Sequence, residues 1–454
     1  MTSKRLRSTP IPGTCDGYTG VDFNLGYHIR HYDLDLTYRV DPNRLEGIAT
    51  LLLDNWAPLR SLTLDLMQNM VARRVIAHGS AGLNITVAKF KQSGNKLRIT
   101  FADEVPVDSE FRLAISYGGN PRPRRTAWGD IGWEELENGS LVAAQPNGAP
   151  SWFPCDDTPD EKATYTLTIS ADNPYVVVCN GRLVDKRSGS SCTTWRYETT
   201  QRMATYLATV QVGEYQCVEL GRNTHVWVSA QNATAARTAL RDQQTMLDFY
   251  EQLFGPYPFA EYTVVVTDDE LEIPLEAQGL SIFGVNHMSG WERLIAHELA
   301  HQWFGNSLGV AQWDDIWLNE GFACYCEWLW FEHRGTPAQV NVDREYAILQ
   351  RKPKDIVVGA PGPRDMFDDR VYKRGAMALH ALRRALGSSA FFDALRRYVA
   401  AGTHSVVEPQ DLKRELYAAA ESVAASTGDS TGRQIVDEIL YAWLFEKSLP
   451  ECPR

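Results

Sequence analysis

Residues 294–306, Leu-Ile-Ala-His-Glu-Leu-Ala-His-Gln-Trp-Phe-Gly-Asn, constrain this chain more than any other stretch. They contain two histidines four residues apart, His297 and His301, with Glu298 directly after the first. On a helix, residues four apart lie on one face, so both imidazoles can reach one ion while the carboxylate of Glu298 points beside it. Imidazole nitrogens are preferred ligands of zinc. The pattern therefore predicts two zinc ligands, His297 and His301, and a general base, Glu298.

A helix over this stretch is predicted independently of the histidines. Ser289 is followed three residues later by Glu292, which is a capping-box pattern, and residues 291–304 contain neither glycine nor proline. Gly305 and the asparagine after it then give a stop signal. The four-residue spacing of the histidines therefore has a geometric meaning.

Glu320 is the candidate for a third ligand. It follows His301 after eighteen residues and lies in Trp-Leu-Asn-Glu-Gly-Phe-Ala, residues 317–323. This segment starts a second predicted helix that runs toward His333. A carboxylate from a neighbouring helix completes a set of two histidines and one glutamate and leaves the fourth position of zinc for water. That arrangement is typical of a catalytic zinc site rather than of a closed structural one.

Composition limits the classes of protein to consider. With 454 residues, 44% hydrophobic and 22% charged, the chain has the make-up of a soluble globular protein of about two or three domains. A net charge of -12 argues against nucleic acid and an anionic membrane surface as partners. The basic N-terminus is not followed by an apolar run, and no stretch reaches roughly 18 apolar residues. Eight thinly spread cysteines are not a disulfide scaffold, so we expect a cytoplasmic protein.

The periodicity of the chain changes near residue 220. Before it, alternating apolar residues separated by turn residues predict strands, whereas residues 235–254 and most of the chain from 318 to 448 are predicted helical. We therefore predict an all-β domain over residues 1–220 and a mainly α-helical domain with a small sheet over residues 221–454. The predicted strands are 31–40, 47–53, 62–66, 97–101, 111–117, 164–170, 176–179, 204–213 and 262–267, and a loop is predicted over 418–431.

The motifs carry a resemblance to a known family. HELAHQWFGN, followed at this distance by WLNEGFA, resembles the M1 family of zinc aminopeptidases, which belongs to the thermolysin-like gluzincins. Four further runs follow in the order that this family shows, so the resemblance covers nearly the whole chain. They are residues 31–38, 153–157, 257–259 and 372–375. The resemblance implies an α+β fold of two domains, in which an all-β domain precedes a thermolysin-like catalytic domain that binds one zinc ion.

The same resemblance implies three further site residues. Tyr372 falls on the tyrosine that donates a hydrogen bond to the oxyanion, and Gln145 falls on a position that helps to hold the free amino group of the substrate. Glu276 falls on the glutamate that binds the α-ammonium group. The family has Gly-x-Met-Glu-Asn there, whereas this chain has Ile-Pro-Leu-Glu-Ala-Gln-Gly over residues 273–279. The acid is kept while its Gly, Met and Asn neighbours are replaced. Because those neighbours also contact the substrate in this family, we expect their replacement to affect substrate specificity and strict exopeptidase behaviour.

The predicted reaction is hydrolysis of the N-terminal peptide bond. Zinc lowers the pKa of bound water to about 7, and Glu298 would take its proton and pass it to the leaving amine. A peptide with a free N-terminus is the expected partner, and a homo-oligomer is possible. Two alternatives remain. One is a thermolysin-like endopeptidase or specialised zinc hydrolase, and the other is a non-catalytic binding protein, against which the intact set with Glu298 counts.

Other polar residues near these motifs have simpler interpretations. Arg370, Lys373 and Arg374 could bind substrate carboxylates or pair with Asp368 and Asp369, but they are interpreted as a solvated charged face, since charged residues on helices are mostly exposed. Cys324 and Cys326 follow Glu320 closely and are interpreted as helix packing, because a thiolate ligand would be redundant.

Overall fold

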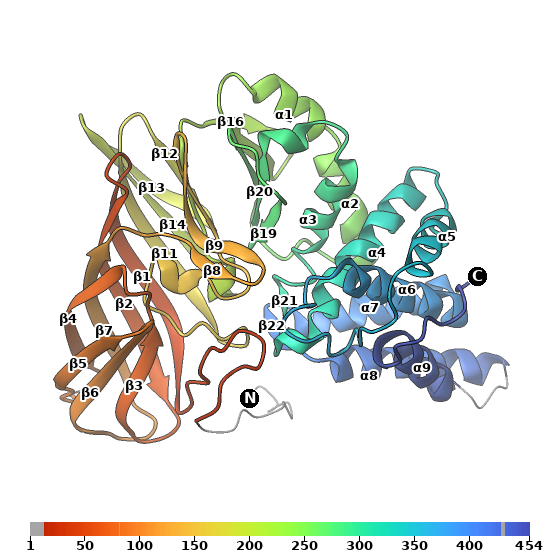
Figure 1. Cartoon of the computed structure of the whole chain (residues 1–454), viewed down its shortest axis with the longest axis horizontal. Helices are drawn as coiled ribbons and strands as arrows, with labels where there is room; N and C mark the ends of the chain where they lie inside the picture. The colour runs from red at the N-terminus through yellow and green to blue at the C-terminus, as the bar shows by residue number, and fades with distance from the viewer. Residues whose placement is uncertain (1–12, 81, 428–431) are drawn as a thin grey trace. The chain divides into compact units, whose positions relative to one another are not determined.

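The computed structural model describes residues 13–80, 82–427 and 432–454, which form two compact units (Figure 1). The β-rich unit contains the described residues up to Thr238 together with Phe259–Ser289. The helical unit contains Ala239–Pro258 and the described part of Gly290–Arg454. The predicted fold class is confirmed, because an all-β domain precedes a helical domain with a small sheet.

A seven-stranded sheet forms the largest part of the β-rich unit. Its strand order is β13 (Arg182–Ser188), β14 (Cys192–Ala204), β11 (Lys162–Asp172), β1 (Tyr27–Arg39), β2 (Arg44–Asn55), β7 (Glu110–Gly119) and β4 (Met70–Gly79). Along β1, buried residues alternate with more exposed ones, which is the pattern of a strand with one face on the core. Strand β1 pairs in parallel with β11 and antiparallel with β2.

Two smaller sheets complete the N-terminal part of this unit. A three-stranded sheet has the order β3 (Leu59–Asp65), β6 (Lys96–Val105) and β5 (Val87–Ser93). A five-stranded sheet has the order β12 (Val176–Cys179), β15 (Val210–Gly213), β10 (Gly139–Ala143), β9 (Gly129–Leu136) and β8 (Arg124–Thr126). The chain leaves β10 through an irregular loop and a short turn of helix, η1 (Ala149–Ser151), and this loop contains Gln145.

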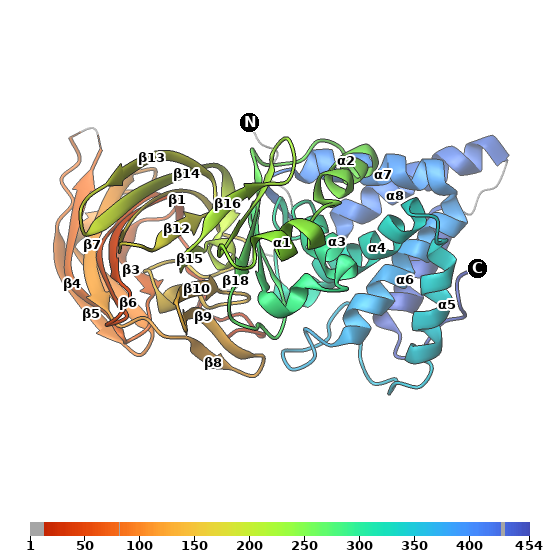
Figure 2. The ribbon, with the colours of Figure 1, turned by 90° about the horizontal axis from the view of Figure 1, so that it is seen from above.

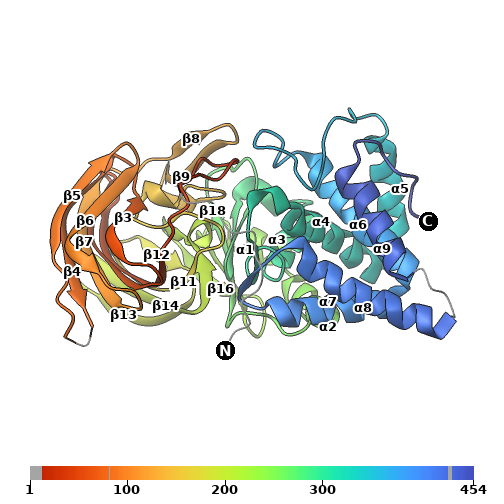
Figure 3. The ribbon, with the colours of Figure 1, turned by 90° about the horizontal axis from the view of Figure 1, so that it is seen from below.

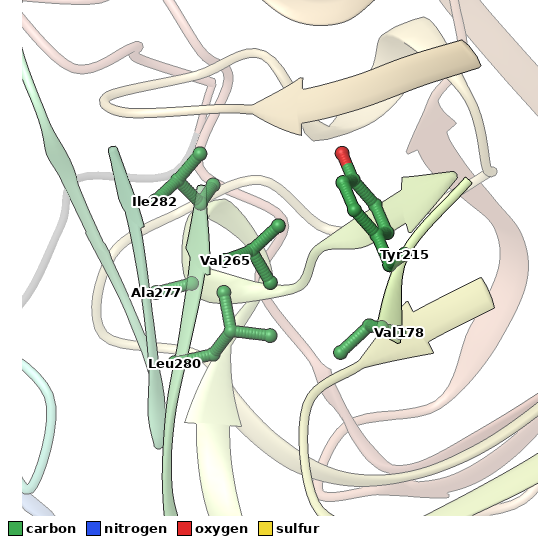
Figure 4. Packing of buried hydrophobic residues seen from close by; sticks show 6 residues of the cluster. All are labelled: Val178, Tyr215, Val265, Ala277, Leu280 and Ile282. Atoms are coloured by element: carbon green, nitrogen blue, oxygen red, sulfur yellow. The ribbon is translucent and has the colours of Figure 1, made fainter. Parts of the chain in front are cut away.

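A second five-stranded sheet positions Glu276. Its order is β16 (Gln216–Glu219), β17 (Thr224–Val228), β18 (Tyr262–Thr267), β20 (Leu280–Gly284) and β19 (Leu275–Ala277). Strands β19 and β20 form a tight hairpin in which Ala277 pairs with Leu280. Both residues belong to an apolar cluster with Val178 and Tyr215, and Figure 4 shows the side chain of Leu280 facing these two residues. Burial of this apolar surface fixes the hairpin on the rest of the unit.

The turn of this hairpin is also held by hydrogen bonds. The Asn180 side-chain amide donates to the backbone carbonyls of Leu207 and Gln278, at 2.9 Å each. Because Gln278 is in the turn that joins β19 to β20, this buried amide ties the hairpin to the segment that follows β14. Glu276 therefore sits on a well-supported strand.

The helical unit is built from eight helices and a short terminal turn within the residues that the structure describes. They are α2 (Gln243–Phe254), α3 (Glu292–Ala300), α4 (Trp317–His333), α5 (Ala338–Leu349), α6 (Asp369–Leu386), α7 (Ser388–Gly402), α8 (Pro409–Thr427), α9 (Gly432–Leu440) and η5 (Tyr441–Phe445). A two-stranded sheet, β21 (Leu308–Val310) with β22 (Ser405–Val407), completes it. Helix α4 packs against α6, and the two lie side by side in Figures 2 and 3.

Most predicted elements are present, including α4, but four predictions about local structure are wrong. The helix predicted over 235–254 is divided into α1 (Ala233–Ala239) and α2. Leu240 stays buried in the intervening turn, so the apolar period continues where the helix does not. Within residues 204–213, only Ala204, the last residue of β14, and the four residues of β15 are strand. Before β15, Thr205–Leu207 form a short helical turn whose Thr205 hydroxyl donates to Asp157 at 2.6 Å.

The other two errors concern helix ends. Helix α3 begins at Glu292 with Trp291 as its N-cap residue, so the capping box predicted from Ser289 is not formed in the described chain. Helix α8 continues to Thr427 through the alanine-rich part of the loop predicted over 418–431, because alanine favours helix most strongly. The remainder of that loop, residues 428–431, lies outside the described residues.

Two composition-based expectations can be compared with the structure. All eight cysteines carry free thiols, as expected for a chain without a disulfide framework. In the described ranges, each helix is too short or too polar to cross a membrane.

Candidate metal centre

Helices α3 and α4 bring His297, His301 and Glu320 together. The Nε2 atoms of His297 and His301 lie 3.4 Å and 3.3 Å from Oε2 of Glu320, and all three side chains are buried. Such distances are at the long end of the range for hydrogen bonds. Ligands at about 2.0–2.2 Å from a tetrahedral zinc ion lie roughly 3.4 Å from one another, so the spacing fits zinc. The three predicted ligands thus converge on one point.

The second ring nitrogen of each histidine is occupied. Nδ1 of His297 lies 2.8 Å from Oε1 of Glu327, and Nδ1 of His301 lies 3.0 Å from the backbone carbonyl of Phe304. A carboxylate and a carbonyl can only accept, so each Nδ1 donates and each Nε2 is the nitrogen left to bind a metal ion. Glu327 also accepts from Nη1 of Arg293 at 2.9 Å. Both rings are therefore held with Nε2 pointing at Glu320.

The electrostatics of the cluster favour a bound cation. Burial would lower the pKa of His297, but hydrogen bonds with Glu320 and Glu327 raise it to about 9. Burial would raise the pKa of Glu320, but His301 and His297 lower it to about 2. Two buried carboxylates thus face the two imidazoles, and the site attracts positive charge, either as a proton or as a metal dication.

The two predicted catalytic residues lie beside these ligands. Glu298 is buried on α3 next to His297. The ring of Tyr372, on α6, stacks with the ring of His297 at 6.0 Å between centroids and an angle of 16° between planes. Tyr372 is half-buried. A carboxylate and a phenol thus accompany the ligand set, which is the inventory needed for proton transfer and for stabilising an oxyanion.

The positions of Glu320 and Tyr372 depend on a close crossing of α4 and α6. Gly321 follows the ligand, and Gly375 lies one turn beyond Tyr372. A Cβ atom built on either glycine would lie 2.9 Å from the Cα of the other, closer than real Cβ contacts. Glycine at both positions is what allows the two backbones to approach this closely.

The three cationic residues that follow Asp369 are not a solvated face, contrary to the prediction. Arg370, Lys373 and Arg374 are 9%, 8% and 3% exposed. Asp368, the N-cap residue of α6, accepts from the backbone N–H of Arg370 at 2.9 Å and from Nε of its guanidinium at 2.8 Å. Helix α6 is covered by neighbouring helices on the side that carries these residues, and side-chain type alone does not reveal such packing.

Arg374 holds the last segment of the helical unit. Its guanidinium donates to the backbone carbonyls of four residues near the end of the chain. They are Glu446 at 2.7 Å and Ala442, Lys447 and Ser448 at 3.3 Å each. The segment after η5 is thereby tied to the helix that carries Tyr372.

Glu327 and Arg293 are site residues that the sequence interpretation missed. Glu327 lies seven residues after Glu320, so two helical turns bring it to the same face of α4. This spacing is the signal that could have identified it. The predictions for Cys324 and Cys326 agree with the structure, since both thiols are buried in helix packing.

The two residues predicted to bind the substrate amine meet in the β-rich unit. Nε2 of Gln145 donates to Oε1 of Glu276 at 2.6 Å. Glu276 is 8% exposed, and Gln145 is half-buried. The amide fixes one carboxylate oxygen and thereby orients the other.

Comparison with known families agrees with this site. Residues 238–443 match the model of the peptidase family M1 domain, and residues 28–207 match that of the peptidase M1 N-terminal domain. The chain belongs to peptidase family M1. Its His297, His301 and Glu320 are the zinc site typical of M1 peptidases, so the predicted family and ligand set are confirmed.

Relatives of this M1 family member include both short and long proteins. An M1 zinc metallopeptidase from Deinococcus radiodurans has 27% identity and a TM-score of 0.82, with 97% of this chain and 98% of that chain covered. Aminopeptidase M1-D of Oryza sativa subsp. japonica is 26% identical, with 84% of this chain and 47% of that protein covered. Human endoplasmic reticulum aminopeptidase 1 is 28% identical, with 84% and 44% covered. The chain thus spans about half the length of these two aminopeptidases.

Proposed function

We propose that this chain is a zinc-dependent aminopeptidase that hydrolyses the N-terminal peptide bond of peptides. The observation that carries this proposal is the buried set of His297, His301 and Glu320 with Glu298 beside it. Two relatives that share its family are aminopeptidases by name. A point mutant of the Deinococcus radiodurans peptidase, with a TM-score of 0.83 to this chain, is bound to a Tyr-Ser-Ala substrate. Both facts support a peptide as the substrate.

The proposed mechanism gives each residue near the ligands one task. Zinc, when bound, supplies Lewis acidity that brings the pKa of water to about 7 and polarises a carbonyl oxygen. Glu298 accepts a proton as water attacks the peptide carbonyl and then delivers it to the leaving amine. Tyr372 donates its hydroxyl proton in a hydrogen bond to the oxyanion, and its stacking on His297 keeps the phenol beside the ligand set.

Recognition of the free amine is assigned to Glu276 with Gln145. An α-ammonium group requires a carboxylate partner, and a charge-assisted hydrogen bond to it is stronger than a neutral one. The 2.6 Å bond from Gln145 holds one oxygen of Glu276, which supports a fixed acceptor for this group. An endopeptidase has no need of such an acceptor, so this pair favours the exopeptidase over the thermolysin-like alternative.

Hydrolysis of aminoacyl chromogenic amides tests the proposal. Each amide is offered with a free and with an N-acetylated amine to the zinc-loaded protein and to the variants Glu298→Gln and Glu276→Gln. We expect cleavage of the free amines only, loss of cleavage in Glu298→Gln with zinc retained, and a raised KM in Glu276→Gln. The exposed Glu272, four residues earlier, supplies the matched control Glu272→Gln, which should behave as the parent protein.

The alternatives give different results in the same assay. Efficient cleavage of acetylated substrates would favour the endopeptidase and remove the assigned role of Glu276. Zinc binding without cleavage of any amide or peptide would favour a specialised zinc hydrolase or a binding protein.

Three further statements about the chain stay predictions. They are the boundary between domains at residues 220 and 221, the cytoplasmic location and the association of copies. Position 220 lies between β16 and β17 of one sheet. Sedimentation of the purified protein would check association.

A further inference from the structure

Lys373 is a buried cation that the proposed mechanism does not use. It directly follows Tyr372 on α6 and is 8% exposed. Its Nζ lies 3.4 Å from Sγ of Cys324, which is one helical turn beyond Glu320 on α4. Lysine is almost never this buried unless it is paired with an opposite charge. Its position next to a catalytic residue and near a zinc ligand therefore calls for a partner.

Lys373 has acidic neighbours on three helices. Asp369, on its own helix, lies 3.9 Å away. Cys324, which contacts Nζ, is three residues before Glu327 on α4, so Glu327 lies on the same face, and both Glu327 and Glu345 on α5 interact with Lys373 through charge. Burial would lower the pKa of Lys373, but Cys324 and these carboxylates raise it above the ordinary value. Burial also raises the pKa of the Cys324 thiol, so this neighbour is neutral at ordinary pH. The carboxylates are then the anionic neighbours of Lys373.

Glu327 is the most informative of these partners, because it holds His297. Glu327 is a carboxylate, since this buried side chain forms an ion pair with the guanidinium of Arg293 at 2.9 Å. Its Oε1 accepts from both His297 and Arg293. Among the described residues, Oε2 has no hydrogen-bond partner. Lys373 thus acts on Glu327 through charge rather than through a hydrogen bond, in an interior where water screens charge weakly.

We propose that Lys373 is a positioning residue that weakens the electron donation of His297 to zinc by partly neutralising Glu327. A carboxylate paired with Nδ1–H makes an imidazole a stronger ligand, and a nearby cation reduces this effect. With Lys373 present, a zinc ion in the site keeps more of its Lewis acidity and is held less tightly. Lys373 would therefore lower the zinc affinity of the site and raise its catalytic rate. The rate part of this inference rests on the proposed aminopeptidase function.

The test compares zinc affinity and kinetics in three variants of the full chain. Lys373→Met keeps the length of the side chain and removes its charge, Lys373→Arg keeps the charge, and Cys324→Ser leaves all charges unchanged. The zinc dissociation constant is measured by competition with a chromogenic chelator, and kcat and KM are measured on an aminoacyl amide.

The expected effects have opposite signs for affinity and rate. In Lys373→Met we expect about tenfold tighter zinc binding, about tenfold lower kcat and a KM within about twofold of the parent value. Lys373→Arg should keep both zinc affinity and kcat near the parent values. Cys324→Ser should leave zinc affinity within about twofold of the parent value. A merely structural role predicts weaker zinc binding in Lys373→Met, and that result, or unchanged binding, would overturn the inference.

A second variant keeps the inference testable should Lys373→Met fail to fold. Glu345→Gln removes another carboxylate that faces Lys373, so the lysine acts more strongly on Glu327 and zinc should bind a few fold more weakly. Tighter or unchanged binding would contradict the inference. Failure of the proposed function is distinguishable, because it leaves all variants without hydrolysis while the order of zinc affinities still decides the role of Lys373.

Discussion

Gly321 and Gly375 meet where α4 and α6 cross, so closely that a Cβ atom on either would lie 2.9 Å from the Cα of the other. One glycine directly follows the zinc ligand Glu320, and the other lies one turn beyond Tyr372. The contact is between backbones, so it does not depend on the rotamer of any side chain. It therefore sets the separation between a ligand and the proposed oxyanion donor.

Substitution of Gly375 tests this relationship. In Gly375→Ala the helices must move apart, which should cost about 1–3 kcal/mol of the free energy of unfolding. It should also lower kcat more than it changes KM, because Tyr372 moves away from Glu320. Denaturant unfolding and kinetics on an aminoacyl amide measure both effects. Gly17→Ala is the control, since Gly17 is exposed and has open space around its Cβ position among the described residues. An unchanged kcat would show that the crossing does not position Tyr372.

Removal of the Tyr372 hydroxyl should separate catalysis from metal binding. Tyr372→Phe keeps the ring that stacks on His297 but loses the donor to the oxyanion. We expect kcat to fall about 10²- to 10³-fold with zinc affinity unchanged. Chelator competition and steady-state kinetics check this expectation, with Tyr441→Phe, at a residue 60% exposed, as the control. A parallel loss of zinc would instead indicate a structural role for the phenol.

Zinc affinity should rise with pH. Because hydrogen bonds with Glu320 and Glu327 raise the pKa of His297 to about 9, this imidazole holds a proton at neutral pH that zinc must displace. Below about pH 9 this proton competes with zinc for the imidazole nitrogen. The dissociation constant of zinc should therefore fall about tenfold for each pH unit between roughly 6 and 8. Chelator competition at several pH values measures the slope. Calorimetry in two buffers should find about one proton released, and a flat profile would contradict the prediction.

A different group should make stability itself depend on pH. Burial, with Asp314 and Glu408 nearby, raises the pKa of Asp315 to about 8. The folded state then binds a proton that the unfolded state releases near pH 4, so stability is complete below about pH 4 and is lost as pH rises to about 8. Relative to the parent, Asp315→Asn should gain up to about 5 kcal/mol of stability between pH 4 and pH 8. Denaturant unfolding at both values measures this, with the exposed Asp365→Asn as the control. The same difference in unfolding free energy between variant and parent at both pH values would refute the prediction.

The part of the site that sequence could predict is the part set by local geometry. His297 and Glu298 lie on α3 and His301 is its C-cap residue, still with helical backbone angles, so the helical period alone orders the three. Glu320 begins a helix whose bounds, Trp317–His333, agree with the prediction because apolar residues fill it and a glycine follows its end. Strands with one buried face are predictable as well, because the alternation of apolar residues along a strand is also set by local geometry.

The remaining features depend on contacts between distant segments. Gln145 and Glu276 are 131 residues apart, and only the resemblance to a family connected them before the structure did. Lys373 and Arg374 have the composition of a surface, yet the packing of α6 buries both. Glu327 had a usable signal in its spacing from Glu320. The break between α1 and α2 had no signal in the sequence, because the buried Leu240 continues the apolar period across it.

Arg374 recognises the end of the helical unit through backbone carbonyls, which every amino acid provides. Substitutions of the exposed residues 445–448 therefore leave the acceptors in place, whereas an insertion or deletion shifts them out of register with the guanidinium. The exposed part of this segment should accordingly tolerate changes of identity, the buried Trp443 and Leu444 should not, and the whole segment should resist changes of length. Engineered variants should therefore keep the length of this segment and can change the identity of its exposed residues.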